Sequence, residues 1–328
     1  MSLNIRVIQL KKLKLLKYNP RFQVFLYKLK SVLNFFRGLF SNKVSSSEDF
    51  FYIVGCGRSG NTLLRRLLQE KYSIYIPGET YVIPETVAAL IKNNGLEWNE
   101  IVDISLAKLD YHEEMKHIYD GRINEFAQQA KMWAEKDHAL GKLYKELYLW
   151  MAREKGVECE FVGDKTPLNT LYLGLIKYMH PNAKFIYIVR DPIDVCYSYV
   201  ESGLNHDYKS AAMRWKQSVY AWEEFKKSNR ASNMYMLKYE DLVHEPERVT
   251  TEIGKKFGFP TRNEMVVESG YSRTKYGDVE ALRHHSNVLN PPSTKSIGKG
   301  RNNIKEYDLK IVKHVLGDSI TGQGYEVV

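Results

Sequence analysis

Three segments of this sequence combine charged side chains with turns that could place them around an anion. The first is the loop GCGRSGNT from Gly55 to Thr62, which separates an apolar run from a leucine-rich one. Its spacing matches the phosphate-binding loop G-x-x-x-x-G-K-[ST], with Asn61 where that loop has lysine. Glycines let a backbone approach a ligand, and free N–H groups at a helix start attract negative charge. This segment therefore predicts a site for a phosphate-like group.

Arg58 lies inside this loop and brings a positive charge to it. A guanidinium can bind an anion through two parallel hydrogen bonds. Because the lysine that contacts the β- and γ-phosphates is missing, the loop predicts a phosphate-like ligand other than a magnesium nucleoside triphosphate. The residues expected to surround this ligand are Gly57, Arg58, Ser59, Gly60, Asn61 and Thr62.

The second segment consists of two separate stretches. In the first, Glu79 follows the turn pair Pro77-Gly78, and in the second, Lys165 lies in Asp164-Lys165-Thr166-Pro167. On local chemistry alone, Glu79 is a solvated carboxylate at the start of a helix over 81–93. Lys165 follows a strand predicted over 158–163, and the end of a strand is where α/β sheets hold ligands. Asp164 or Thr166 as a helix cap, with Pro167 at the first helical position, is a compatible second interpretation.

The third segment begins with KFIYIV at 184–189, the clearest strand of the chain, and continues into Arg190-Asp191-Pro192 and a helix through Val200. An arginine at the carboxyl end of a strand and a serine two turns into the next helix, here Ser198, can converge on one oxyanion. An ion pair of Arg190 with Asp191 or Asp194 is the alternative.

Together these segments resemble the sulfotransferases that use 3′-phosphoadenosine 5′-phosphosulfate (PAPS). G-x-G-R-S-G-N-T is similar to their 5′-phosphosulfate loop, and PGETYVIP at 77–84 resembles the segment of protein-tyrosine sulfotransferases that contains the catalytic base. The resemblance implies that Glu79 is the base and that Lys165, in a K-x-P context, contacts the sulfuryl group. The similarity of 190–198 to R-D-P-x-x-x-x-x-S implies that Arg190 and Ser198 hold the 3′-phosphate.

The resemblance covers roughly residues 50–310 and implies further nucleotide contacts near the C-terminus. Residues 239–242 are similar to a Y-E-D-L segment whose tyrosine borders the nucleotide, and 296–303 resemble a loop that folds over it. Gly300 stands where the family has an aromatic residue in that loop. Ser286 follows a histidine pair that lacks a third ligand at metal spacing, so no metal site is expected. The additional contact candidates are Tyr239, Ser286, Lys299 and Arg301.

The elements that must position these residues are strands alternating with helices. Apolar, β-branched runs predict strands over 50–54, 72–76, 158–163, 184–189 and 234–237, and helical periodicity predicts helices over 61–70, 112–136, 138–155 and 207–228. The prediction is an α/β fold of the P-loop-like, three-layer type, with a central parallel sheet flanked by helices. Residues 49–328 form this domain, and 97–157 form a helical insertion in it.

The charge of the chain is concentrated in its first 48 residues. Of 328 residues, 48 are basic and 39 acidic, and residues 1–48 hold ten of the basic and one of the acidic ones. The rest carries 38 of each, so a nucleic-acid partner is not expected for the body. With 44% apolar residues the chain is globular, and three scattered cysteines predict neither a disulfide framework nor a zinc cluster.

Residues 1–48 are predicted to be a basic amphipathic arm and a linker. Apolar residues recur at helical spacing over 20–40, but Lys28, Lys30 and Arg37 interrupt a membrane span, and no signal-peptide pattern precedes them. Residues 1–40 either bind an anionic membrane surface or pack on the body or a partner chain. The expected location is cytoplasmic or peripheral to a membrane.

The resemblance implies sulfuryl transfer from PAPS to a hydroxyl of a peptide tyrosine, glycan or lipid. Glu79 would act as general base, while Arg58, Lys165 and the loop amides would stabilise charge without a metal. The alternatives are a P-loop nucleotide kinase and a non-enzymatic nucleotide-binding membrane scaffold. The sequence leaves the acceptor and the oligomeric state open, a homodimer included.

Overall fold

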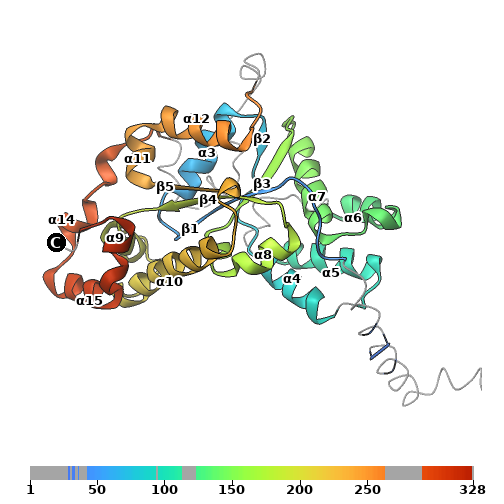
Figure 1. Ribbon diagram of the computed structural model, residues 1–328, viewed down its shortest axis with the longest axis horizontal. Helices are drawn as coiled ribbons and strands as arrows, with labels where there is room; N and C mark the ends of the chain where they lie inside the picture. The colour runs from blue at the N-terminus through green and yellow to red at the C-terminus, as the bar shows by residue number, and fades with distance from the viewer. Residues whose placement is uncertain are drawn as a thin grey trace, which may run out of the picture.

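Five parallel strands form the central sheet of the computed structural model, in the order β2-β3-β1-β4-β5 (Figure 1). The structure describes residues 43–93, 95–112, 123–262 and 290–326, together with Leu29, Val32, Leu33 and Phe36. The strands are β1 Phe51–Gly55, β2 Ile74–Tyr75, β3 Phe161–Lys165, β4 Lys184–Val189 and β5 Met234–Lys238. The expected parallel sheet is therefore confirmed.

Side chains of β1 alternate between two apolar cores, one on each face of the sheet. Phe51 and Ile53 face one core, and Tyr52 and Val54 face the other. Helices α3 Asn61–Lys71, α11 Tyr239–His244 and α12 Pro246–Phe257 cover the first face. Helices α8 Leu173–Met179, α9 Pro192–Glu201 and α10 Tyr208–Lys227 cover the second, below the sheet in Figure 1. The result is three layers with the sheet in the middle.

A helical group extends the second face beside β2 and β3. It contains α4 Ile83–Lys92, α5 Trp98–Asp110, α6 Ile123–Lys131 and α7 Leu140–Glu154. The helix expected over 112–136 differs: its described part ends at Lys131, and a separate 3₁₀ turn, η2 Glu135–Asp137, follows. Trp98 Nε1 donates to the Ala130 carbonyl, which satisfies that carbonyl at the end of α6.

Two strands have bounds that differ from the expectation, each because of its neighbours. β3 extends to Lys165, because that residue pairs with Ile53 of the central strand. β2 is restricted to Ile74–Tyr75 rather than 72–76, since Tyr72 forms an isolated antiparallel bridge with Thr261 instead. Lys165 is consequently the last residue of a strand rather than part of the loop after it.

The C-terminal part packs against the helices that cover the second face of the sheet. Helices α14 Lys299–Asn303 and α15 Glu306–Leu316 lie beside α9 and α10 (Figure 1). At the other end of the chain, only Leu29, Val32, Leu33 and Phe36 of the predicted arm are described, and all four are helical and exposed. Within the described ranges, no helix has the length and apolarity needed to span a bilayer.

Candidate active site

The glycine-rich loop connects β1 to α3 at the carboxyl edge of the sheet. Gly60 precedes α3 with φ of 96°, a left-handed conformation that favours glycine, and a Cβ there would lie 2.4 Å from the Tyr239 ring. α3 begins at Asn61 and has no acidic residue in its first turn, so its N–H groups open toward the cleft without a competing carboxylate. The sequence prediction of a strand, loop and helix is confirmed here.

Asn61 stands where a nucleotide-binding loop has lysine, and its side chain makes a hydrogen bond within the loop. Its Nδ2 donates to the Cys56 carbonyl at 2.8 Å, and so closes the turn. Its Oδ1 and the Ser59 hydroxyl are both buried and have no hydrogen-bond partner among the described residues. Buried polar atoms of this kind are expected to have partners, so the loop has unused capacity for a polar ligand.

Arg58 and Arg190 meet at the side of this loop. Arg58 Nε donates to Ser198 Oγ at 3.0 Å, and Arg190 Nη1 donates to the Arg58 carbonyl at 3.2 Å. Burial lowers the pKa of the Arg58 guanidinium, and the nearby Arg190 charge acts in the same direction. An anion bound between the two arginines would relieve this repulsion, so the electrostatics favour a negatively charged ligand.

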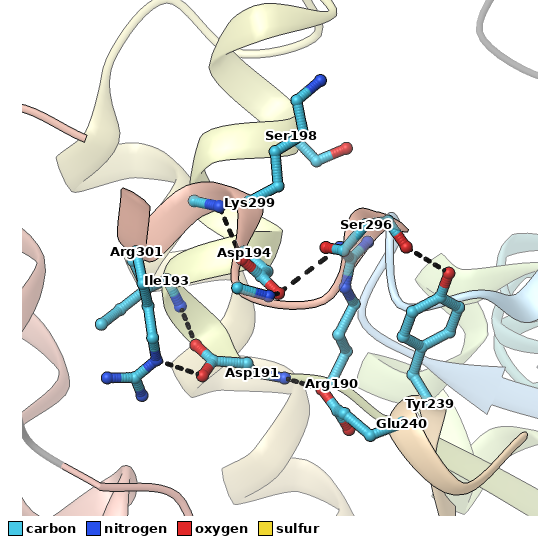
Figure 2. Close-up of polar contacts among 12 residues, drawn as sticks. Arg190, Asp191, Ile193, Asp194, Ser198, Tyr239, Glu240, Ser296, Lys299 and Arg301 are labelled. Carbon is cyan, nitrogen blue, oxygen red and sulfur yellow. Dashed lines mark hydrogen bonds and ion pairs between the residues drawn. The ribbon is translucent and has the colours of Figure 1, made fainter. Parts of the chain in front are cut away.

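Arg190 is held from three sides, as Figure 2 shows. Its guanidinium lies 4.5 Å from the centre of the Tyr239 ring, and its Nη2 donates to the Ser296 carbonyl at 2.6 Å. The Tyr239 hydroxyl is 2.6 Å from Ser296 Oγ, which joins the C-terminal loop to the same cluster. Arg190 Nη2 also lies 3.6 Å from Asp194. The ion pair considered as the alternative is therefore present together with the grouping of Arg190, Arg58 and Ser198.

Asp194 holds the C-terminal loop through backbone hydrogen bonds. The amides of Gly298 and Gly300 donate to its two carboxylate oxygens at 2.8 and 2.6 Å. A Cβ on Gly300 would lie 2.5 Å from the Ile193 carbonyl oxygen, so the glycine permits this close approach to α9. The departure from the family's aromatic residue at this position thus has a packing reason.

The C-terminal candidates occupy different places. Lys299 lines the cleft beside Tyr197. The Arg301 guanidinium instead binds Asp191 through Nε at 2.6 Å and the Glu326 carbonyl through Nη2, away from Arg190 (Figure 2). Ser286 lies outside the described residues.

Glu79 lies at the cleft with both carboxylate oxygens bound. Lys165 Nζ donates to Oε1 at 2.5 Å, and the Tyr81 hydroxyl donates to Oε2 at 2.5 Å. Lys165 is fully buried and does not line the cleft, whereas Glu79 and Tyr81 do. The solvated carboxylate suggested by local chemistry is therefore not what the structure shows.

A buried network fixes the Glu79 segment against β3. Thr80 donates from its hydroxyl to Asp164 at 2.8 Å and from its backbone N–H to Thr166 Oγ1 at 3.1 Å. Tyr148 of α7 donates to the same Asp164 oxygen, and burial raises the pKa of that carboxyl. Thr166 is the N-cap residue of η3 Pro167–Tyr172, and Pro167 occupies the first position, as the second interpretation expects. The Thr166 hydroxyl, however, accepts from Thr80 instead of from a helix N–H.

The network is the part of the site that sequence reasoning missed. Tyr148 comes from the helical insertion, and no pattern in the sequence indicates its contact with Asp164. For Thr80 and Asp164 there is a signal, because each neighbours a candidate residue, Glu79 or Lys165, in a short motif.

A single cleft of about 1480 Å³ connects the loop, Glu79 and Arg190. Its wall includes most of the described candidates, and Ser59, Lys165 and Arg301 are the exceptions. No group of three or more potential metal ligands occurs in the ranges that the structure covers. The cleft thus contains two functional parts: arginines that can bind an anion, and the Glu79 carboxylate, whose two oxygens are both held by hydrogen bonds.

Residues 51–263 match the sequence profile described as the sulfotransferase family. This chain belongs to the sulfotransferase family. The match covers more than half of the chain, including the loop, Glu79, Lys165 and Arg190, so the resemblance noted from the sequence is confirmed.

Relatives with curated names point to the same family. A putative protein-tyrosine sulfotransferase of Caenorhabditis briggsae is 22% identical over 210 residues, which are 62% of this chain and 63% of the relative. A protein-tyrosine sulfotransferase of Drosophila melanogaster is 20% identical over 254 residues, or 76% of this chain and 42% of the relative. The matches span between 24% and 63% of the length of the curated relatives.

A solved structure agrees with the fold. The sulfotransferase domain from the curacin biosynthetic pathway superposes with a TM-score of 0.56 at 18% identity, covering 86% of this chain and 99% of that domain. The P-loop-like sulfotransferase fold expected from the sequence is confirmed.

Proposed function

We propose that this protein transfers the sulfuryl group of PAPS to a hydroxyl acceptor. The observation that carries this proposal is that the Arg58–Ser198–Arg190 cluster and Glu79 line one cleft. In the transfer, the bond between sulfur and the leaving 5′-phosphate oxygen breaks, and a bond between sulfur and the acceptor oxygen forms. The acceptor proton goes to Glu79, which acts as general base.

The loop is proposed to bind the 5′-phosphosulfate. Gly57, Arg58 and 60–62 line the cleft, where the loop amides and the Arg58 guanidinium would stabilise negative charge as the bond to sulfur breaks. Lys165 lies next to the Glu79 carboxylate, and a shift of its ammonium toward the sulfuryl oxygens would free Glu79 Oε1 for the acceptor proton. Such transfers depend on positioning and charge neutralisation, which these groups supply.

Arg190 and Ser198 are proposed to select the donor by its 3′-phosphate. Without that phosphate, the charges of Arg58 and Arg190 would repel each other, and Asp194 would be the acidic partner of Arg190. A site built for a charged group discriminates strongly against ligands that lack it. The stacking of Arg190 on Tyr239 also keeps the guanidinium directed to one place.

The acceptor is proposed to lie against an apolar part of the cleft wall. Four large apolar side chains line it while remaining 40 to 44% exposed: Leu168, Leu171, Leu204 and Met213. Exposed apolar groups in a cleft favour a ligand with apolar surface. Of the acceptor classes considered, a peptide tyrosine or a lipid hydroxyl is favoured over a glycan, and the names of the curated relatives support tyrosine.

The test is calorimetric titration of adenosine 3′,5′-bisphosphate, with and without magnesium. The wild type is expected to bind it without metal, and Arg190→Ala to bind about 10- to 100-fold more weakly, the range for a hydrogen bond to a charged group. Arg230→Ala, which removes an exposed arginine, is the matched control and should bind as the wild type does. Transfer of labelled sulfuryl from PAPS to a tyrosine peptide, a long-chain alcohol and an oligosaccharide then identifies the acceptor. Preference for magnesium ATP would contradict the proposal.

A further inference from the structure

Two residues of the cleft have a backbone conformation that side chains disfavour. Among the residues that the structure describes, Arg58 and Tyr81 are the non-glycine positions with positive φ, at 65° and 54°. Both line the cleft, one in the anion-binding loop and one beside Glu79. Strain of this kind persists where the surroundings enforce it, and it concentrates at functional sites.

The strain at Tyr81 lies in a tight turn. The Val82 N–H donates to the Thr80 carbonyl across Tyr81, which together with the positive φ is the pattern of the rare γ-turn. The turn directs the Tyr81 side chain back to Glu79, two residues earlier, where its hydroxyl donates to Oε2 at 2.5 Å. Thr80, at the start of the turn, is held by the buried Asp164.

The Tyr81 ring is fixed from a second direction. It stacks on the His112 imidazole with 4.9 Å between ring centres and 11° between ring planes. The phenol position is therefore set by the backbone turn, by the stack with His112 just after α5 and by the carboxylate. A side chain restrained in this way can orient the group that it touches.

We propose that Tyr81 is the positioning residue of the base: its hydroxyl holds Glu79 Oε2 and leaves Oε1 for the acceptor proton. This inference rests on the proposed function, because the orientation of Glu79 matters for the reaction only if Glu79 takes that proton. Oε1 is bound by Lys165, whose ammonium is proposed above to shift to the sulfuryl group during transfer. Tyr81 then remains as the donor that keeps the carboxylate from rotating.

Three charged or titratable groups besides Tyr81 interact with the Glu79 carboxylate. Lys165 contacts it from β3, Arg58 acts on it from the loop, and Tyr199 acts on it from α9. Replacing Tyr81 with phenylalanine leaves all three in place and also retains the stack on His112. Loss of a hydrogen-bond donor makes a carboxylate hold a proton more tightly.

The experiment compares Tyr81→Phe with the wild type across pH, in full-length protein with PAPS and the acceptor identified above. The expected result is an approximately tenfold lower kcat, an unchanged KM for PAPS and an acidic limb of the kcat profile displaced to higher pH. Tyr307→Phe, which changes an exposed tyrosine, is the matched control and should leave all three unaltered. Thermal unfolding of both variants shows whether the fold is retained.

A double-substitution cycle separates positioning from a merely structural role. If Tyr81 acts through Glu79, then Glu79→Gln combined with Tyr81→Phe should be no slower than Glu79→Gln alone. A profile of Tyr81→Phe that coincides with the wild type, or losses that multiply in the double variant, would overturn the inference while the proposed function stands. Absence of sulfuryl transfer by the wild type would overturn both.

Discussion

Lys165 Nζ lies 2.5 Å from Glu79 Oε1, and the Lys165 side chain has no exposed surface. Lys165 ends β3, and Glu79 lies in the segment that follows β2, so the contact joins neighbouring elements at the carboxyl edge of the sheet. A charge so far from water is tolerated only when it is paired. The ion pair therefore ties the proposed base to the fold itself.

Removing one member of this pair should destabilise the protein strongly. Lys165→Met leaves the Glu79 carboxylate without its ammonium partner, and breaking a buried pair in this way costs about 3–5 kcal/mol. Adding Glu79→Gln removes the second charge and should restore most of the free energy of unfolding. The measurement is urea denaturation of the two single variants and the double variant.

An exposed pair provides the control for this prediction. Lys310 and Glu306 are 2.8 Å apart on α15, but both are mostly exposed, so Lys310→Met should change the free energy of unfolding by about 1 kcal/mol or less. Equal changes in the free energy of unfolding for Lys165→Met and Lys310→Met would show that the buried pair contributes no more to stability than the exposed one.

Much of the fold could be predicted because its signals are local. β4 has the predicted bounds, since the apolar run FIYIV is uninterrupted and lies between Lys184 and Arg190. The meeting of Arg58 with Arg190 follows from β1 and β4 being adjacent parallel strands, whose carboxyl ends share one edge. Sequence spacing alone was enough to place both residues at that edge.

The remainder depends on an unusual backbone conformation and on contacts between distant segments, neither of which a residue pattern indicates. Tyr81 reaches Glu79 only because its backbone is left-handed, a conformation that its residue type disfavours. Arg301 is a candidate nucleotide contact in the sequence, and the binding of its guanidinium to Asp191 and the Glu326 carbonyl is not indicated by any local pattern. The reason for Gly300 likewise appears only once α9 packs against the C-terminal loop.

Gly300→Ala tests whether the close approach of the C-terminal loop to α9 requires glycine at this position. The new Cβ would meet the Ile193 carbonyl at 2.5 Å, and because that atom is backbone, the loop must shift. The expected cost is about 1–3 kcal/mol of stability, together with weaker binding of adenosine 3′,5′-bisphosphate, since the same loop holds Arg190 through Ser296. Thermal unfolding and calorimetry measure the two effects.

Gly322→Ala is the matched control for that substitution. No atom lies within 4 Å of a Cβ at Gly322, so the change in stability should be within about 0.5 kcal/mol. If the two alanine variants behave alike, the close approach of the loop to α9 does not limit the residue at position 300.

His180 connects the β1 side of the core to the insertion and should make stability depend on pH. Its Nε2 donates to the Gly141 carbonyl at 2.9 Å, and its Nδ1 lies 2.7 Å from the Tyr52 hydroxyl, which donates to it when the ring is neutral. Burial lowers the pKa of this imidazole to about 4. The unfolded chain, with an ordinary histidine pKa of about 6.5, therefore takes up a proton at a higher pH than the folded protein does.

The stability that the neutral His180 contributes is complete above about pH 6.5 and is lost as the pH falls toward 4. Between pH 7 and 5 the wild type should lose about 2 kcal/mol of unfolding free energy relative to His180→Gln, whose side chain does not titrate. Asp164 acts in the opposite direction, because burial raises its carboxyl pKa, but it is present in both proteins and cancels in the difference. Urea denaturation at the two pH values gives the result, and His206→Gln, at an exposed histidine, should follow the wild type. Parallel losses in wild type and His180→Gln would mean that another group governs the pH dependence.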